Sequence, residues 1–489
     1  MSASFDIVKD QSSQVRAGAA SAWVASWRDA PVETMLLAGA LAGLAWAPFW
    51  LGGDRPLAWG VNGVWFPCLT LVYELSLLWR GRKHPFALKQ IIAPAVLFIL
   101  VVLWIGVQIS SLSPPLFTHP IWAMSSDALG TDVRGSISVN PQASALALMR
   151  LLTDASLLWL MVQLCRAPRR ATLTLQTIVG IVTVYSAYGL LLSALYGGGI
   201  PFFDAPDSGR FVRATFVNRN NFATFAGLGL IGATALILRL YRHEVPDLQG
   251  IGSYRLSRLI DATGRRGWML LGAGLIILVA LLGTVSRGGI FATGLGLFAL
   301  FILHFARQKK PGAQQIETLL FVTVALVGGF LLFGDRIVGR ISETGFADAS
   351  RRAVYMIVVR SLFDAPYLGF GYGAFADVFP MYRDQSISSS GVWDMAHNTY
   401  LEVLQGLGLL FGGALIACLA LLVWKCLRGA VSRRRDATAS VVATSAALLV
   451  GLHAMVDFSL QIEAVTLTFM ALLGAGVAQS ESSRRVTAD

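Results

Sequence analysis

The chain has 489 residues, of which 55% are hydrophobic and 14% are charged, and its formal net charge is +11. Soluble proteins carry about 25% charged residues, so this composition does not cover a water-facing surface of such a size. The apolar residues also come in runs of about 20, the length of a membrane-spanning helix; one such run is 267–285. The composition therefore excludes a soluble enzyme, a nucleic-acid binder and a secreted disulfide scaffold. It predicts an all-α integral membrane protein.

The hydropathy pattern predicts about twelve membrane spans. They lie at 34–51, 58–79, 90–109, 143–164, 172–196, 220–240, 267–285, 288–306, 317–334, 398–424, 438–457 and 462–478. The predicted organisation is a cytoplasmic tail at 1–33, spans one to nine within 34–334, a large periplasmic loop at 335–397, spans ten to twelve within 398–478, and a second cytoplasmic tail at 479–489.

The charges of the loops predict the orientation of the spans. One side of the bilayer is rich in lysine and arginine, whereas the other has long loops at 110–142 and 335–397 and a shorter one at 197–219. By the positive-inside rule, the basic side is the cytoplasm, where both termini also lie. The loop 335–397 is too long for a simple connector, so we expect it to fold back onto the membrane, with 355–363 as a short amphipathic helix.

The outer side departs from this rule, because it carries several arginines and no lysine. Arginine binds phosphate with a planar, bidentate fork and stays charged in a partly dry site, so the set predicts a site for a phosphorylated ligand. The candidates are Arg210, Arg213, Arg219, Arg287, Arg351 and Arg352. For any one of them, pairing with a loop acid is the alternative. For Arg287, in the short turn TVSRGGIF, the alternative is a snorkelling anchor.

A histidine stands where the long loop ends and an apolar helix is expected to begin, in WDMAHNTYLEVLQGLG (393–408). Asn398 is a suitable N-cap for this helix, and Glu402 lies one turn in. Because imidazole takes up a proton near neutral pH, His397 at the outer surface is a candidate base. An ordinary interfacial histidine is the alternative.

A second polar pair, His453 and Asp457, lies in HAMVDFSLQIEA (453–464). The two residues are expected one turn apart, on one face of the eleventh span near its outer end. Ionisable groups in a membrane are costly and indicate function. Structural bonding between helices explains this pair nearly as well.

The sequence indicates neither a metal nor a cofactor. The outer side has no DxD, no HExxH and no histidine cluster, and the chain has no Walker-type glycine loop. The turn LGFGYGAF (368–375) superficially resembles a nucleotide-binding fingerprint, but it belongs to no strand–helix unit. Its glycines are expected to shape a tight turn.

Five segments together resemble the O-antigen ligase/polymerase superfamily of bacterial polytopic membrane glycosyltransferases. They are RATFVNRNNFATF (213–225), TVSRGG (284–289), RRAVY…DAPYLGFGYGAF (351–375), AHNTYLEVLQGLGLLFGG (396–413) and HAMVDFSLQIEA (453–464). The resemblance covers the C-terminal half in the family's order, whereas residues 1–200 match in hydropathy alone. Two positions depart from the pattern: Tyr355 stands where members often have tryptophan, and Glu463 where they have proline.

The resemblance implies an inner-membrane enzyme that moves a glycan from undecaprenyl diphosphate to an acceptor hydroxyl at the periplasmic face, without a metal and with inversion. It implies that His397 stands next to the acceptor hydroxyl as base or orienting group. The arginines it assigns to the diphosphate are Arg213, Arg219, Arg287 and Arg351. The residues expected to support them are Asn398, Tyr400, Glu402, His453 and Asp457. The implied acceptor is a growing glycan or the lipid A core, and the remaining partner is membrane lipid, with no nucleic acid.

Other interpretations stay open from the sequence. Polymerase and ligase differ by acceptor only, and the sequence does not decide between them. A transporter for a polysaccharide or lipid-linked glycan also suits twelve spans, but no repeat relates the two halves and ionisable residues are rare in mid-span. Arg150 and Asp154, one turn apart in the fourth span, are the exceptions. A non-catalytic scaffold of a polysaccharide assembly complex is the third interpretation.

Overall fold

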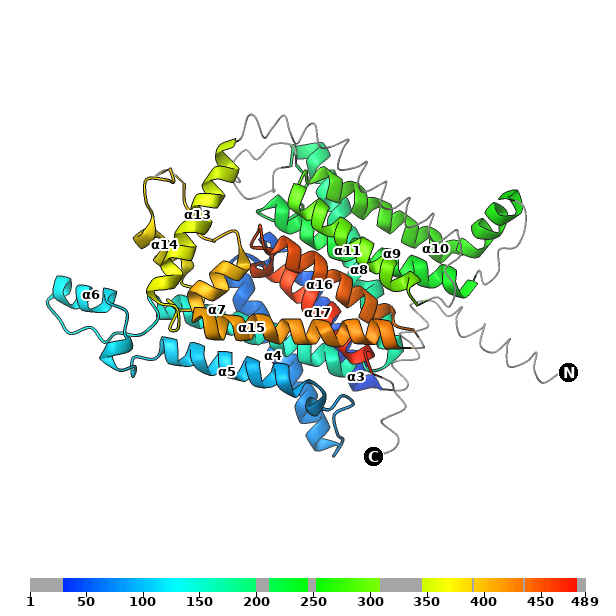
Figure 1. Ribbon diagram of the computed structural model, residues 1–489. Coiled ribbons are helices and arrows are strands. Elements are labelled where there is room, and N and C mark those ends of the chain that lie inside the picture. Colours follow the sequence, from blue (N-terminus) through cyan, green and yellow to red (C-terminus); the bar gives the residue numbers. More distant parts are fainter. Residues whose placement is uncertain are drawn as a thin grey trace.

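The computed structural model describes residues 30–198, 211–244, 252–307, 345–388, 391–433 and 436–481. Within these ranges the chain forms helices and no β-strand, and the long helices lie side by side in a bundle (Figure 1). The α-helices are α3 (Pro31–Trp46), α4 (Pro56–Trp79), α5 (Ile92–Ile109), α6 (Ile121–Leu129), α7 (Pro141–Leu164), α8 (Pro168–Tyr196), α9 (Arg219–Glu244), α10 (Gly252–Gly283), α11 (Arg287–Phe305), α13 (Gly345–Asp364), α14 (Phe375–Tyr382), α15 (Thr399–Ser432), α16 (Thr438–His453) and α17 (Glu463–Gln479). Short 3₁₀ turns are η1 (Leu51–Gly53), η2 (Leu88–Ile91), η3 (Pro115–Phe117) and η4 (Ser459–Gln461).

Eight helical segments of the described chain are long and apolar enough to cross a membrane. They are Pro56–Trp79, Leu88–Ile109, Pro141–Leu164, Pro168–Tyr196, Arg219–Tyr241, Thr263–Gly283, Arg287–Phe305 and Thr399–Ser432. Three shorter apolar helices, α3, α16 and α17, accompany them. The prediction of an all-helical, multi-pass membrane protein is thereby confirmed, whereas the count of twelve and the orientation stay predictions. The ninth predicted span, 317–334, lies outside the described residues.

Two predicted spans end earlier than their hydropathy indicates. The first, 34–51, corresponds to α3, which ends at Trp46, and the eleventh, 438–457, corresponds to α16, which ends at His453. The prediction that His453 and Asp457 share a helix face is therefore wrong. The Asp457 carboxylate instead accepts the N–H of Phe458 at 2.9 Å. Aspartate side chains that bond the local backbone in this way compete with helix formation.

Helix α17 lies at the centre of the bundle, and every one of its residues is buried. It packs against α16, α7 and α15. Two of its glycines permit this close approach: a β carbon on Gly474 would stand 2.8 Å from the Met161 side chain, and one on Gly476 would stand 2.2 Å from that of Ala443. Such small residues let membrane helices approach closely enough for dispersion contacts to hold them together.

The connection between α13 and α14 docks on α15 backbone to backbone. Helix α15 is kinked at Gly408, whose φ is +76°, and a β carbon there would stand 2.4 Å from the carbonyl oxygen of Tyr367. Opposite the preceding turn of α15, the N–H of Gly371 donates to Gly406 at 3.0 Å. This contact leaves no room for side chains, so the glycines of LGFGYGAF do shape a tight turn. Positive φ values occur at Gly369, Gly371 and Gly373.

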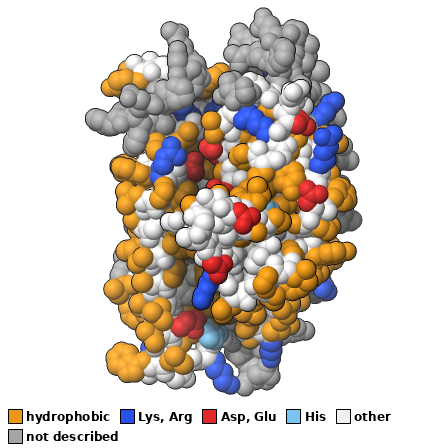
Figure 2. Space-filling view, turned by 90° about the vertical axis from the view of Figure 1, so that its left-hand side faces the viewer, with side chains coloured by type: hydrophobic (Ala, Val, Ile, Leu, Met, Phe, Trp, Pro, Cys, Tyr) orange, Lys and Arg blue, Asp and Glu red, His pale blue; other side chains and the backbone are white. Residues whose placement is uncertain are grey.

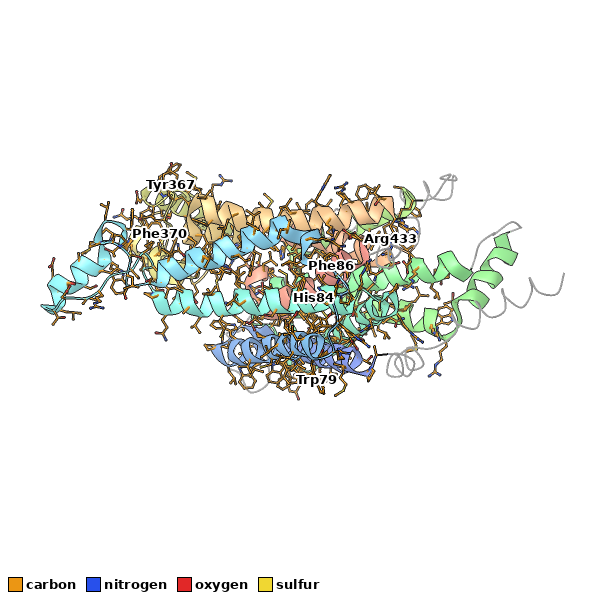
Figure 3. The ribbon with its side chains drawn as sticks, turned by 90° about the horizontal axis from the view of Figure 1, so that it is seen from below. Trp79, His84, Phe86, Tyr367, Phe370 and Arg433 are labelled. Atoms are coloured by element: carbon orange, nitrogen blue, oxygen red, sulfur yellow. The ribbon has the colours of Figure 1, made fainter. Side chains whose placement is uncertain are left out.

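Helices α13 and α14 lie at one end of the bundle, together with α6 (Figure 1). The predicted amphipathic helix 355–363 is part of α13, which is longer. Seen from below, Tyr367 and Phe370 lie at this end, whereas Phe86 and Arg433 lie toward the other (Figure 3). We call it the α13 end; it includes the connecting loops 47–55, 211–218, 284–286, 393–398 and 454–462. Figure 2 looks onto it and shows acidic and basic side chains scattered among hydrophobic ones.

Candidate functional site

The segment 454–459, which joins α16 to α17, is the meeting point of the loops at the α13 end. Helix α15 begins against it, because the N–H of Thr399 donates to the carbonyl of Ala454 at 2.9 Å. The side chain of Asn398 donates to the carbonyl of Met455, also at 2.9 Å. Asn398 accepts the N–H of Leu401 at 3.1 Å as well, so its prediction as N-cap is confirmed.

Helices α9 and α13 reach the same segment through polar side chains. The amide of Asn220, in the first turn of α9, donates to the carboxylate of Asp457 at 2.9 Å. The guanidinium of Arg351, on α13, donates to the carbonyl of Val456 at 3.3 Å. The start of α11 adjoins Val456 too, since a β carbon on Gly288 would stand 3.3 Å from its side chain. Together with α15, the helices α9, α11 and α13 therefore contact this segment from distant parts of the sequence.

The buried side chain of His453 packs against segment 454–459 and connects it to α9 and α11. Its side chain is 2% exposed, and its Nδ1 lies 2.6 Å from the hydroxyl of Thr224 on α9. The hydroxyl of Ser459 lies 3.3 Å from the same nitrogen and donates to Asp457 at 3.0 Å. The ring also packs on α11, because a β carbon on Gly288 would stand 3.1 Å from it. His453 and Asp457 therefore belong to one buried network, although they do not share a helix.

The backbone of His397 is held in an unusual conformation. Its φ is +54°, in the left-handed region that few residues other than glycine adopt. The hydroxyl of Tyr355 donates to the His397 carbonyl at 2.8 Å. On the other side of the residue, the N–H of Ala396 donates to the carboxylate of Glu402 at 2.9 Å. Glu402 and Tyr355 therefore secure the turn that presents the imidazole.

The imidazole of His397 is enclosed by aromatic rings. Its centroid lies 4.9 Å from that of Phe458 and 5.4 Å from that of Trp393, both edge-on. Its Nδ1 is buried and has no hydrogen-bond partner in the described part of the chain. Burial lowers the pKa of His397 to about 4, assisted by the charge of Arg351 and opposed by that of Asp457. At neutral pH the ring is therefore uncharged, and one of its two nitrogens has a free lone pair.

Backbone strain is concentrated around the same place. In the ranges that the structure describes, positive φ values at residues other than glycine occur at Leu51, Ala214, Val285 and His397. Each lies in a different loop of the α13 end. Conformations of this kind cost free energy and persist where the surroundings impose them, which is typical of functional sites.

Arg287, Arg351 and Arg352 differ in their burial and in their contacts with described residues. Arg287 is the first residue of α11, follows the N-cap Ser286, is half-buried, and makes no ion pair or hydrogen bond with a described residue. Arg351 is half-buried and faces segment 454–459, whereas its neighbour Arg352 is exposed. The structure thus decides which member of this adjacent pair lies toward His397.

The other candidates come from the loop before α9 and from the first residue of that helix. Arg213 is 5% exposed, and its guanidinium donates to the carbonyls of Gly198 at 2.9 Å and Val217 at 3.4 Å, so it braces this loop. The guanidinium of Arg219 lies over the ring of Phe211, 3.9 Å from its centroid. Arg210 lies outside the described residues.

The remaining supporting candidate is Tyr400, whose hydroxyl donates to the carbonyl of Gly451 on α16 at 2.9 Å and so ties α15 to α16. Sequence reasoning gave no role to Tyr355 or Phe458, which hold the backbone and the ring of His397. The departure at Tyr355 from the family's usual tryptophan was a signal for the first. Phe458 carried no signal, because an aromatic residue in an apolar segment is ordinary.

Comparison with known proteins gives one family. The model of the O-Antigen ligase family matches residues 272–417, from within α10 to within α15. This match confirms the resemblance to the O-antigen ligase/polymerase superfamily over that segment, and it supports an enzyme of the ligase or polymerase kind. Arg287, Arg351 and His397 lie inside the match, whereas α9 and segment 454–459 lie outside it. No curated protein matches the chain.

Proposed function

We propose, from the O-antigen ligase match over residues 272–417, that this protein is an inner-membrane glycosyltransferase. It moves a glycan from undecaprenyl diphosphate to an acceptor hydroxyl on a growing glycan or on the lipid A core, at the periplasmic face. One observation carries the proposal: Arg351, the start of α11 after Arg287, and His397 approach the same segment, 454–459, from three separate parts of the match.

The chemistry divides naturally between these groups. As the acceptor oxygen attacks the anomeric carbon, the bond from that carbon to the diphosphate oxygen breaks and negative charge grows on the leaving group. Arginine donors that are already in place stabilise this charge most in the transition state. Attack from the face opposite the leaving group inverts the anomeric centre. The proton of the acceptor hydroxyl passes to the uncharged imidazole of His397.

In this proposal Arg287 and Arg351 supply the principal contacts to the diphosphate. Arg287 stands at the first turn of α11, where the helix dipole also favours an anion. Arg213 acts from the loop before α9 and chiefly holds that loop in shape. Arg219 acts from the first residue of α9. The guanidinium groups of these four arginines neutralise the two phosphates without a metal, as the resemblance implies.

The pH dependence of transfer tests the assignment of His397. Because burial holds the pKa of its imidazole at about 4, we expect kcat/KM to fall on the acid side near pH 4 instead of near the ordinary histidine value of about 6.5. Arg351→Met removes a charge that lowers this pKa, so the acid limb of the residual activity should move to higher pH. Asp457→Asn should move it lower. A wild-type limb near 6.5 that neither variant shifts contradicts the assignment.

Reconstitution tests the function as a whole. Purified protein in liposomes receives undecaprenyl-diphosphate-linked repeat units as sole substrate, and the products are separated by size. A ladder identifies a polymerase that uses the growing chain as acceptor. Transfer that begins only when lipid A core is supplied identifies a ligase. If no product forms under either condition, with authentic substrates and folded protein, the proposal is overturned in favour of a transporter or a scaffold.

A further inference from the structure

A charged pair outside the family match lies inside the bundle, close to the α13 end. The Nε of Arg150, on α7, lies 3.5 Å from a carboxylate oxygen of Glu463, the first residue of α17. The same guanidinium donates to the carbonyl of Gln461 and lies over the indole of Trp59, 4.5 Å from the ring centroid. The other oxygen of Glu463 accepts from the amide of Asn62 at 2.5 Å.

Burying these two charged side chains costs free energy, so a specific role is needed to explain their retention. The side chains of Arg150 and Glu463 are 20% and 4% exposed, and α7 is long and apolar enough to cross a membrane. Charged groups in such helices are expensive and are retained where they do something specific. The contacts of Arg150 fix the turn η4, which begins at Ser459, the last residue of segment 454–459, and the start of α17 directly after it.

A series of neighbouring contacts links this pair to His397. The guanidinium of Arg150 donates to the carbonyl of Gln461. Gln461 ends the turn η4, which packs against α15, and its side chain lies near enough to the Glu402 carboxylate to interact with its charge. Glu402 in turn accepts the N–H of Ala396 at 2.9 Å, immediately before His397. The strained residue is therefore connected, through two side chains, to the interior pair.

We propose that Arg150 and Glu463 are positioning residues: through Gln461 and Glu402 they hold the left-handed turn that presents the His397 imidazole. The proposal rests on the proposed function for its kinetic test. The N-terminal half of the chain, which the family match does not cover, thereby sets the geometry of the transfer site. Small displacements of a reacting group lower rates steeply, by about 10²-fold for 1 Å.

Three variants test the idea kinetically: Arg150→Met, Glu463→Gln and their combination. We expect each to lower kcat by about 10- to 100-fold, while the KM for the lipid-linked donor stays within about twofold because the diphosphate arginines are untouched. Arg80→Met is the matched control. It breaks a comparable interhelical pair, Arg80 with Glu33 at 3.1 Å, at the end of α4 farthest from Asn62, and should leave kcat near wild type.

A second measurement needs no turnover. Diethylpyrocarbonate acylates uncharged imidazoles, and peptide mass spectrometry gives its rate at each histidine. We expect Glu463→Gln and Arg150→Met to change the rate at His397 several-fold and to leave the rate at His119 unchanged. Should Arg150→Met accelerate both, the protein has opened generally, and the closely isosteric Glu463→Gln decides. Unchanged labelling of His397 together with unchanged kcat overturns the positioning role. Altered labelling in a protein that transfers nothing overturns the proposed function alone.

Discussion

Replacing Arg351 with methionine is expected to lower the rate of glycan transfer by about 10²–10³-fold, whereas the same change at Arg352 is expected to leave it within about twofold. The two residues are adjacent on α13, so they share a helix and a local composition. Arg351 is half-buried and donates to Val456 beside His397, whereas Arg352 is exposed. Losing Arg351 removes charge stabilisation from the leaving diphosphate; losing Arg352 removes a solvated charge.

Initial rates of the purified variants in liposomes measure this difference, with thermal unfolding as a check that both proteins fold. Arg351→Lys is an informative third variant. Lysine keeps the charge but not the planar, bidentate fork, so we expect it to restore part of the lost rate. Equal losses at Arg351 and Arg352 would mean that the charge of α13 matters only in bulk, which contradicts the assignment.

Replacing His397 with asparagine is expected to lower kcat by about 10²–10⁴-fold, the range of a lost general base. Asparagine is the better choice than alanine because it tolerates the left-handed φ of +54°. The backbone bonds from Tyr355 and to Glu402 are then kept. The affinity for the lipid-linked donor should be unchanged, because the arginines bind its diphosphate.

The relative size of the two effects is itself a prediction. Negative charge on the leaving group develops in every productive transition state, and positioning with charge stabilisation outweighs proton removal. We therefore expect the loss of one key arginine to cost at least as much as the loss of His397. A variant series in which His397 changes abolish transfer, while every arginine variant stays near wild type, would reverse this order.

Much of the fold depends on residues that are close together in the sequence, so the sequence alone determined it. Apolar runs of bilayer length specify the long helices, because in lipid the backbone must satisfy its own hydrogen bonds. Asn398 specifies the start of α15, and the glycines of 368–375 specify a tight turn, because capping and positive φ depend on a few neighbouring residues. The arginine set and His397 were visible as exceptions to the charge rule and as a histidine at a helix start.

Only the tertiary structure decided how these pieces meet. Asn220 bonds Asp457 across 237 residues of sequence, and Arg150 bonds Gln461 across 311; no local pattern encodes such pairs. The end of α16 at His453 was missed because Asp457 looks like one more helical turn until its carboxylate is seen to bond the next backbone N–H. Adjacent residues such as Arg351 and Arg352 are equivalent in composition, and the packing of α13 against segment 454–459 separates them. Helix packing, which joins residues from distant parts of the chain, is what turns a set of candidate side chains into a site.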